Sequence, residues 1–464
     1  MKNKGTKLTF ISDTHHFSRT LSSDGRAYDL RSGSDQKCLN ETGGILDAAF
    51  SKIKKGDTDA VMIVGDLTND GERVSHDEFR EKLYDLQKSK PVYVITATHD
   101  WCCDENPRKF SGYAVYHDAP TVSHDELRDF YYDFGSKQAL SEYITHLGTC
   151  SYTVDIGENV RLLALNDDQN GKGRAGFQEE HFKWIEQQIK QARDDGKILL
   201  GMEHHLLIPH IHPLVMGGST CVGDREYVAS RLADAGLRYM FVGHSHIQRI
   251  DSFTSEKGNM ITEINIGSLC GYPAPIVNVE IGEDGLKIST DFVESFEFDG
   301  KRFNAGIYLK NKIYALVDRV LDGAEISQSE FCDRLTALQL NGEKFAPFYP
   351  LAKIFSKYIK NETALGLYKK LKLFGLADSI RYSDVLDFKD KPVMEFVHEF
   401  LLSFFDGGIV RHGEETSYYC LVMGVCDALV KLRACTLTLE IRQLVHNILT
   451  GSQPDINSCF IAFE

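Results

Sequence analysis

Potential metal ligands follow one short apolar run after another in the first half of this chain. Each run is rich in β-branched residues, as is typical of a buried strand. An aspartate or a histidine follows each of these runs within a few residues. The runs are 8–11, 60–64, 92–96, 197–202 and 238–242, and the residues that follow them are Asp13 and His15, Asp66, His99 and Asp100, His204 and His205, and His244 and His246.

Helical patterns alternate with these runs, and this alternation indicates an α/β domain. Amphipathic spacing predicts helices over 45–54, 75–87, 178–193 and 224–235, and a β-hairpin is expected over 152–165. Clefts in open α/β sheets form at the carboxyl ends of the strands. We therefore expect the aspartates and histidines to converge at such an edge.

The chemistry of these side chains predicts a metal centre. Mixed carboxylate and imidazole ligands suit manganese, iron or zinc better than calcium or magnesium. Asp-x-His at 13–15 and His-x-His at 244–246 each place two side chains on one turn. One carboxylate between two such clusters can bridge two ions, the geometry used for in-line phosphoryl displacement. Each motif alone is weak, because a single histidine is usually a surface or satisfied residue, but their order along the chain favours the metal centre.

Beyond about residue 300 the apolar residues recur at helical spacing instead. We predict two domains, residues 1–300 and an all-α C-terminal domain over residues 301–464. The role of the second domain is open, and a lid over the metal cleft and a dimer surface are both hypotheses. The predicted helices cover 313–321, 330–340, 352–359, 365–373, 394–404, 418–432 and 437–449.

The net charge of −15 argues against sequence-independent binding of duplex nucleic acid, which needs a basic face. Any anionic substrate must then be attracted locally, for instance by metal ions. The first 13 residues do not resemble a signal peptide, and no run approaches the roughly 18 apolar residues of a membrane span. We therefore expect a cytoplasmic protein without a membrane partner, and its 11 cysteines are interpreted as reduced thiols.

Taken together, these motifs resemble the calcineurin-like metallophosphoesterase superfamily over about residues 6–295. The blocks that carry the resemblance are Asp13-Thr14-His15, Gly65-Asp66 with Gly71, His99-Asp100, His204-His205 and Gly243-His244-Ser245-His246. Spacing and flanks look most like the branch of class III cyclic nucleotide phosphodiesterases, as do the strand ending at Asn166 and the segment Ile266-Gly267-Ser268. The resemblance implies an α/β/β/α sandwich of two mixed sheets. The helical tail matches no motif of the superfamily.

The resemblance also implies roles for single residues. One metal ion would be held by Asp13, His15 and His246, and a second by His204 and His244, with Asp66 bridging the two. His99 would contact the scissile phosphate or protonate the leaving oxygen, with Asp100 orienting it. A hydroxide between two divalent ions (manganese, iron or zinc) would attack phosphorus. The implied activity is hydrolysis of a small phosphodiester, with a cyclic nucleotide as one candidate substrate.

One position departs from the pattern of the superfamily. Its third block reads Gly-Asn-His-Asp or Gly-Asn-His-Glu, whereas this chain has Ala97-Thr98-His99-Asp100. The asparagine normally gives its amide oxygen to the second metal, and a threonine hydroxyl is a shorter, weaker donor. Either Thr98, or water held by it, completes a weaker second site, or the chain is a weakly active or inactive metal-binding scaffold. A phosphomonoesterase or a phospholipid-headgroup hydrolase is a further alternative, because the superfamily includes both.

Three other histidines are candidates for contact with the substrate. His205 follows a proposed ligand, and His210 and His212 lie in a proline-flanked loop of the kind that often lines a cleft. An ordinary structural role is the alternative for each of them. The helical C-terminal domain is a candidate surface for a homo-oligomer.

Overall fold

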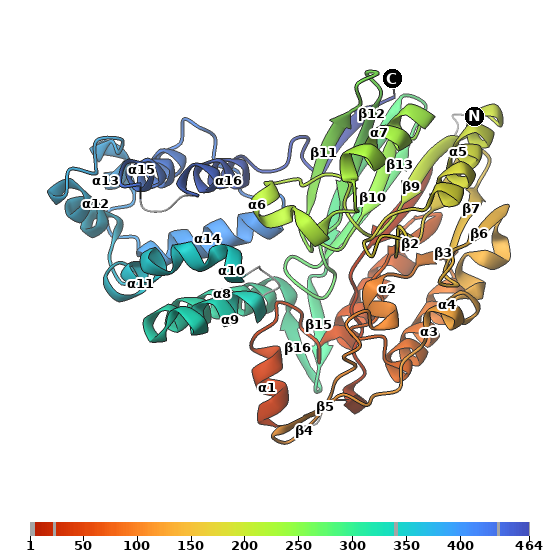
Figure 1. Cartoon of the computed structure of the whole chain (residues 1–464), viewed down its shortest axis with the longest axis horizontal. Helices are drawn as coiled ribbons and strands as arrows, with labels where there is room; N and C mark the ends of the chain where they lie inside the picture. Colours follow the sequence, from red (N-terminus) through yellow and green to blue (C-terminus); the bar gives the residue numbers. More distant parts are fainter. Residues whose placement is uncertain (1–4, 22–24, 338–341, 434–436, 464) are drawn as a thin grey trace.

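The computed structural model of the chain describes residues 5–21, 25–337, 342–433 and 437–463. In these residues two mixed sheets are packed together, with helices on their outer faces, and a helical region follows them (Figure 1). The predicted sandwich of two mixed sheets is thereby confirmed.

The first sheet has a parallel centre. Leu8 of β1 pairs with Ala60 of β2, and Val61 of β2 pairs with Val92 of β3, all in parallel. The other three strands continue the sheet in antiparallel pairing. The order β17-β14-β13-β1-β2-β3 corresponds to Ser458–Ala462, Gly285–Phe292, Pro275–Ile281, Thr6–Ile11, Ala60–Val64 and Val92–Ile95.

The second sheet has parallel strands at its centre and an antiparallel pairing toward each edge. The β8–β9, β9–β10 and β10–β12 pairs are parallel. The predicted hairpin over 152–165 is the antiparallel pair β7–β8. The order β11-β12-β10-β9-β8-β7-β6 corresponds to Arg249–Thr254, Met260–Asn265, Tyr239–Val242, Ile198–Met202, Val160–Ala164, Cys150–Ile156 and Ser141–Ile144.

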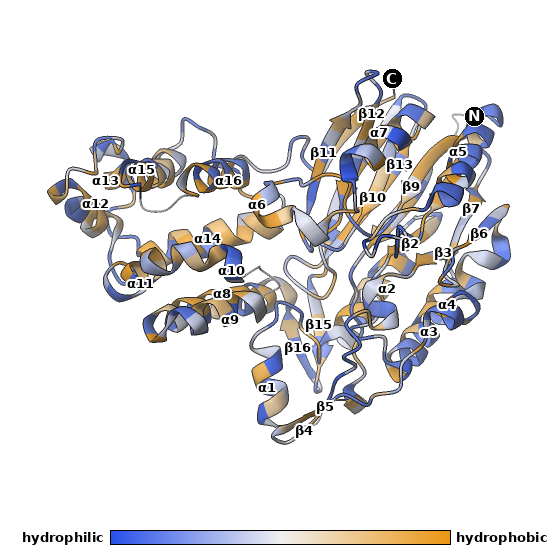
Figure 2. Ribbon diagram, viewed as in Figure 1, coloured by the Kyte–Doolittle hydropathy of each residue, from blue (hydrophilic) through white to orange (hydrophobic). Residues whose placement is uncertain are grey.

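An apolar layer joins the two sheets. Phe10 of β1 stacks on Phe241 of β10 with ring centroids 3.8 Å apart, and both sheets contribute the remaining buried side chains of this layer. Figure 2 shows the corresponding apolar colouring along the strands. Burial of apolar surface stabilises a fold by about 25 cal/mol per Å². The packed apolar layer therefore holds the two sheets in one relative position, and with them the strand ends that face each other.

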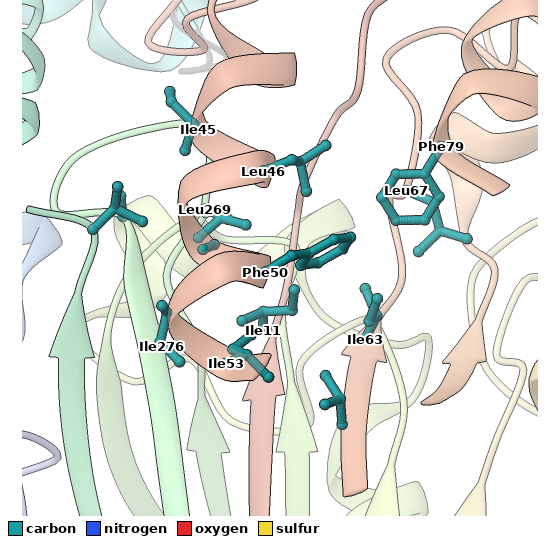
Figure 3. Packing of buried hydrophobic residues seen from close by; sticks show 14 of the residues in the cluster. Ile11, Ile45, Leu46, Phe50, Ile53, Ile63, Leu67, Phe79, Leu269 and Ile276 are labelled. Carbon is teal, nitrogen blue, oxygen red and sulfur yellow. The ribbon is translucent and has the colours of Figure 1, made fainter. Parts of the chain in front are cut away.

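Amphipathic helices cover the outer faces. Figure 3 shows α2 presenting Phe50 and Ile53 toward Ile11 of β1 and Ile63 of β2. The helices of the sandwich are α2 (Thr42–Lys55), α3 (Arg73–Gln87), α5 (Glu179–Asp194) and α7 (Arg225–Ala235). Shorter elements in the connections are α1 (Arg26–Ser32), β4 (Lys109–Ser111), β5 (Ala114–Tyr116), α4 (His124–Phe130) and α6 (Pro213–Met216).

The helical region follows a hairpin of β15 (Ser295–Phe298) and β16 (Lys301–Asn304). It has an apolar cluster of its own, and it also packs on the sandwich through Ile313 of α8 and Ile448 of α16. None of the described helices is long and apolar enough to cross a bilayer. The helices are α8 (Ala305–Ile326), α9 (Gln328–Ala337), α10 (Gly342–Phe345), α11 (Tyr349–Tyr358), α12 (Ala364–Leu373), α13 (Tyr382–Asp387), α14 (Val393–Phe405), α15 (Ser417–Lys431) and α16 (Thr438–Thr450).

Two details differ from the predicted helices. The helix expected over 330–340 reaches into residues 338–340, which lie outside the described residues. The region also ends in a strand, because β17 pairs antiparallel with β14, placing Ser458 opposite Ser289. The open edge of β14 offers backbone groups that this strand satisfies, so the last described residues of the chain belong to the first sheet.

Candidate metal centre

The predicted ligand residues converge where the strands of both sheets end. Within the first sheet, His15 N–H donates to the carbonyl oxygen of Asp66 at 2.9 Å. Between the sheets, His244 N–H donates to Asp13 Oδ2 at 3.0 Å. Backbone hydrogen bonds therefore fix the loops that carry the ligand candidates relative to one another.

Asp13, His15 and His246 form one compact, buried group. Their potential ligand atoms lie within 4.8 Å of one another. His246 Nε2 is 3.3 Å from Asp13 Oδ1 and 3.0 Å from His15 Nε2. Two imidazole nitrogens and a carboxylate oxygen at these separations can share one transition-metal ion.

Asp66, His204 and His244 form a second group of the same size. His204 Nδ1 donates to the carbonyl oxygen of Val64 at 2.8 Å, so Nε2 is the nitrogen directed at Asp66 and available to a metal ion. A backbone contact of this kind is typical of metal-binding imidazoles. Among the described residues, His244 Nδ1 is buried without a hydrogen-bond partner. A cation bound between this nitrogen and His204 Nε2 would satisfy it.

Asp66 connects the two groups. It belongs to a third cluster with His15 and His99, and its Oδ2 lies 3.8 Å from His15 Nε2 and 3.1 Å from His204 Nε2. A carboxylate within reach of the ligands of both groups can bridge two ions. The side chains present therefore fit a dinuclear centre.

The backbone at the ligand candidates is strained. A positive φ costs a residue other than glycine about 1–3 kcal/mol, and such residues cluster at functional sites. Five ligand candidates share this conformation, with φ of 50° at Asp13, 39° at His15, 49° at Asp66, 64° at His244 and 59° at His246.

The charges of the second group compensate one another. Burial alone would raise the pKa of the Asp66 carboxyl, but the neighbouring His204 and His99 hold that pKa well below its usual range. Burial alone would lower the pKa of His204, but the Asp66 carboxylate raises it to about 10. Burial keeps the pKa of His244 well below its usual value. The proton on His204 is therefore the one that an arriving metal ion must displace.

His99 lies beside both groups and is only half-buried. Its backbone N–H donates to Asp66 Oδ1 at 3.1 Å, and its Nδ1 contacts the carbonyl oxygen of Asn69. Because a carbonyl only accepts, Nδ1 carries the proton and the lone pair is at Nε2. Burial, followed by the charge of Lys37, lowers the pKa of His99.

The two residues next to His99 have partners of their own. The Asp100 carboxylate accepts hydrogen bonds from Thr68 N–H at 2.9 Å and Ala97 N–H at 2.8 Å, so it holds the loop backbone around His99. The predicted role of Asp100 in orienting His99 stays a prediction. The Thr98 side chain hydrogen-bonds the Cys103 thiol.

A family model of calcineurin-like phosphoesterases matches residues 6–248. The chain belongs to this family. Family membership and the histidine–aspartate groups together identify it as a metal-dependent phosphoesterase, for which a dimetal site is implied. The comparison with curated proteins found no match.

Several solved structures are similar to this phosphoesterase in part. A dimetal phosphatase from Danio rerio is 13% identical, with a TM-score of 0.44, and the match covers 63% of this chain and 97% of that one. A purple acid phosphatase from yellow lupin seeds is 13% identical, with a TM-score of 0.40 and coverage of 64% and 52%. A 5'-nucleotidase precursor from Thermus thermophilus is 12% identical, with a TM-score of 0.33 and coverage of 67% and 58%. The family assignment rests on the match to residues 6–248.

The three histidines proposed to contact substrate have distinct surroundings in the phosphoesterase. His205 lies beside the second group, where its ring centroid is 4.4 Å from that of His244 and its Nδ1 is 3.1 Å from Asp167 Oδ2. His210 is fully buried, and its Nε2 contacts Glu263 Oε1 at 2.8 Å, so its ring serves an internal pair instead of a cleft. His212 accepts a hydrogen bond from Leu214 N–H at 3.1 Å and caps α6.

Two residues at the centre were missed in the sequence. Gln36 and Lys37 follow α1 in an irregular segment, where the Gln36 amide contacts His246 Nδ1 at 2.9 Å. Lys37 Nζ lies 3.4 Å from His99 Nε2. No periodicity or motif marks this segment in the sequence, so only the tertiary structure reveals that it reaches the ligands.

Proposed function

We propose that the chain hydrolyses a small phosphodiester and that Asp13, His15 and His246 hold one divalent ion while Asp66, His204 and His244 hold a second. The observation that carries the proposal is the position of Asp66, whose carboxylate reaches ligand candidates of both groups. When bound, the two ions supply an activated water as nucleophile and neutralise the charge of the phosphoryl group.

The residues of the chain position the reacting groups. His99 is fixed at Nδ1 by the Asn69 carbonyl group, with its Nε2 beside Lys37 Nζ. Nε2 can contact the phosphate directly or, once protonated, donate to the leaving oxygen. His99, Thr98 and His244 are half-buried, whereas Asp13 and Asp66 are fully buried. The substrate therefore approaches from the side of His99, and water is excluded from the opposite side.

A phosphodiester, including a cyclic nucleotide, is favoured by the segment after β8 that carried the resemblance to cyclic nucleotide phosphodiesterases. In the structure this segment adjoins the centre. Asn166 Nδ2 donates to the carbonyl oxygen of Thr96 at 3.2 Å, next to the loop of His99, and Asp167 holds His205. Asn166, which carried part of this resemblance, therefore also supports the loop of His99.

The test is a substrate panel. Manganese-loaded protein should cleave bis(p-nitrophenyl) phosphate and 3',5'-cyclic AMP with a higher kcat/KM than p-nitrophenyl phosphate. The control is His99→Ala loaded in the same way, in which this activity should fall by about 100-fold or more, as for loss of a general acid. Preference for the monoester would favour the phosphomonoesterase alternative, and activity equal to the control on every substrate would favour the inactive scaffold.

A further inference from the structure

Lys37 is a buried cation at the metal centre. Its side chain is 0% exposed, and its Nζ lies 3.4 Å from His99 Nε2. Since the proton of the His99 ring is at Nδ1, Nε2 accepts from Lys37. Among the residues that the structure describes, no carboxylate lies within ion-pair distance of Lys37 Nζ. Two of its three N–H donors therefore remain for another acceptor.

Such a charge is costly unless something compensates it. An ammonium group that leaves water without a counter-ion loses much of its favourable hydration. Other buried charges near the centre have partners: Asp70 pairs with Arg108 at 2.7 Å, and Asp35 pairs with Arg31. Lys37 lacks such a partner, so the structure contains a cation whose counter-ion is not another described side chain.

The segment around Lys37 is fixed so that the ammonium group points to the centre. Lys37 N–H donates to Asp35 Oδ1 at 2.9 Å, and Cys38 N–H donates to the carbonyl oxygen of Cys270 at 3.0 Å. On the other side, Gln36 contacts the His246 ring. Anchors before, at and after Lys37 therefore determine where its side chain is directed.

We propose that Lys37 binds a non-bridging oxygen of the substrate phosphate and is a catalytic residue of this centre. The phosphate is the missing counter-ion, and the two free N–H donors of Lys37 supply charge-assisted hydrogen bonds to it. Bound divalent ions would add further positive charge, so an anion is needed more in the loaded protein than in the free one. This inference rests on the proposed hydrolysis of a phosphoester.

The first experiment measures binding of inorganic phosphate to the full, manganese-loaded chain by calorimetry. Lys37→Met should weaken phosphate binding by about tenfold to a hundredfold, which corresponds to the loss of a hydrogen bond to a charged group. Lys37→Arg keeps the charge and should restore most of the affinity. Lys54→Met, which removes a surface lysine paired with Asp85, is the matched control and should bind phosphate like the wild type.

The second experiment measures kinetics on bis(p-nitrophenyl) phosphate together with metal content. If Lys37 is catalytic, Lys37→Met should lower kcat/KM by the same factor of about tenfold to a hundredfold as it weakens phosphate binding. It should also raise the inhibition constant of phosphate, while two ions remain bound. Unchanged phosphate binding in Lys37→Met would overturn the proposal, as would loss of metal in proportion to activity. If Lys37→Met does not fold, Lys37→Gln replaces it in the same measurements.

The two proposals fail in different ways. If the wild type hydrolyses none of the substrates, the proposed function is wrong, but phosphate binding still tests Lys37. If the wild type is active and Lys37→Met keeps both its phosphate affinity and its kcat/KM, only the role of Lys37 is wrong.

Discussion

Gly243 offers a direct test of how closely the two sheets must approach at the metal centre. A Cβ atom on Gly243 would lie 1.9 Å from Ser12 Oγ and 2.5 Å from Asp13 Oδ2. Ser12 Oγ itself donates to Asp13 Oδ2 at 2.6 Å. A Cβ atom cannot lie as close as 1.9 Å or 2.5 Å to an oxygen atom that is not bonded to it. Gly243→Ala must therefore displace the Asp13 carboxylate or push the β10 loop away from β1.

The size of the effect follows from these contacts. Overpacking of a buried site costs about 1–3 kcal/mol, and displacing groups that support a metal ligand lowers metal affinity by about tenfold to a hundredfold. We expect Gly243→Ala to fold with a lower melting temperature and to bind the ion of the Asp13 group more weakly. Both effects should exceed those of Gly282→Ala, where the nearest atom to the new Cβ is an ordinary contact at 3.7 Å.

Thermal unfolding and elemental analysis after dialysis against a metal buffer measure the two quantities. Gly282→Ala should match the wild type in both. If Gly243→Ala retained the wild-type metal content and melting temperature, the inferred tight contact between Gly243 and the Asp13 carboxylate would be refuted.

Three further predictions concern the same centre. Since the pKa of His204 is raised to about 10 and those of Asp66 and His244 are lowered, one proton should leave as the second group binds its ion. The affinity of the second group for its metal ion, measured by competition with a chelator, should then rise about tenfold per pH unit from about pH 6 to about pH 9. A metal affinity that does not change with pH would contradict this. Lys312→Met removes a hydrogen bond at 3.1 Å from α8 to Ser32, which is close to Lys37 in sequence. This change should lower kcat/KM several-fold at unchanged metal content. Unaltered kinetics would show that α8 does not position the segment that carries Lys37. Thr98→Asn should strengthen binding of the second ion by about tenfold, on the scale of changes beside a metal site, and an unchanged titration would remove the main reason to doubt that site.

The ligand residues could be predicted because each one directly follows a strand that can be recognised from the neighbouring sequence. Asp13 and His15 follow a strand that its β-branched residues identify, and the same holds for Asp66. Parallel pairing of β1 with β2 then brings the two loops together without any further information. Residue type, strand pattern and sheet geometry all point to the same arrangement, which is the condition under which sequence reasoning succeeds.

Contacts made by distant segments could not be predicted. His210 is surrounded by prolines and apolar residues in sequence, and only the fold brings Glu263 against its ring. The strand β17 is similar, because its five residues join the sheet only where β14 leaves an edge open. Lys37 is the extreme case, since its buried side chain reaches His99, 62 residues along the chain, and the next residue is held by the distant Cys270 backbone.

The conformation of the ligand loops is also outside the reach of simple sequence rules, because a positive φ is uncommon for every residue except glycine, even though aspartate and histidine adopt it more often than most. Here Asp13 and His15 both adopt it. They are held there by the neighbouring strand end, since Asp13 N–H donates to the carbonyl oxygen of Gly65 at 3.2 Å and His15 N–H to that of Asp66 at 2.9 Å. The loop that carries Asp66 thus stabilises the strained conformation of the loop that carries the first group. Backbone contacts of this kind between the ligand loops lower the entropy that binding of an ion has to overcome.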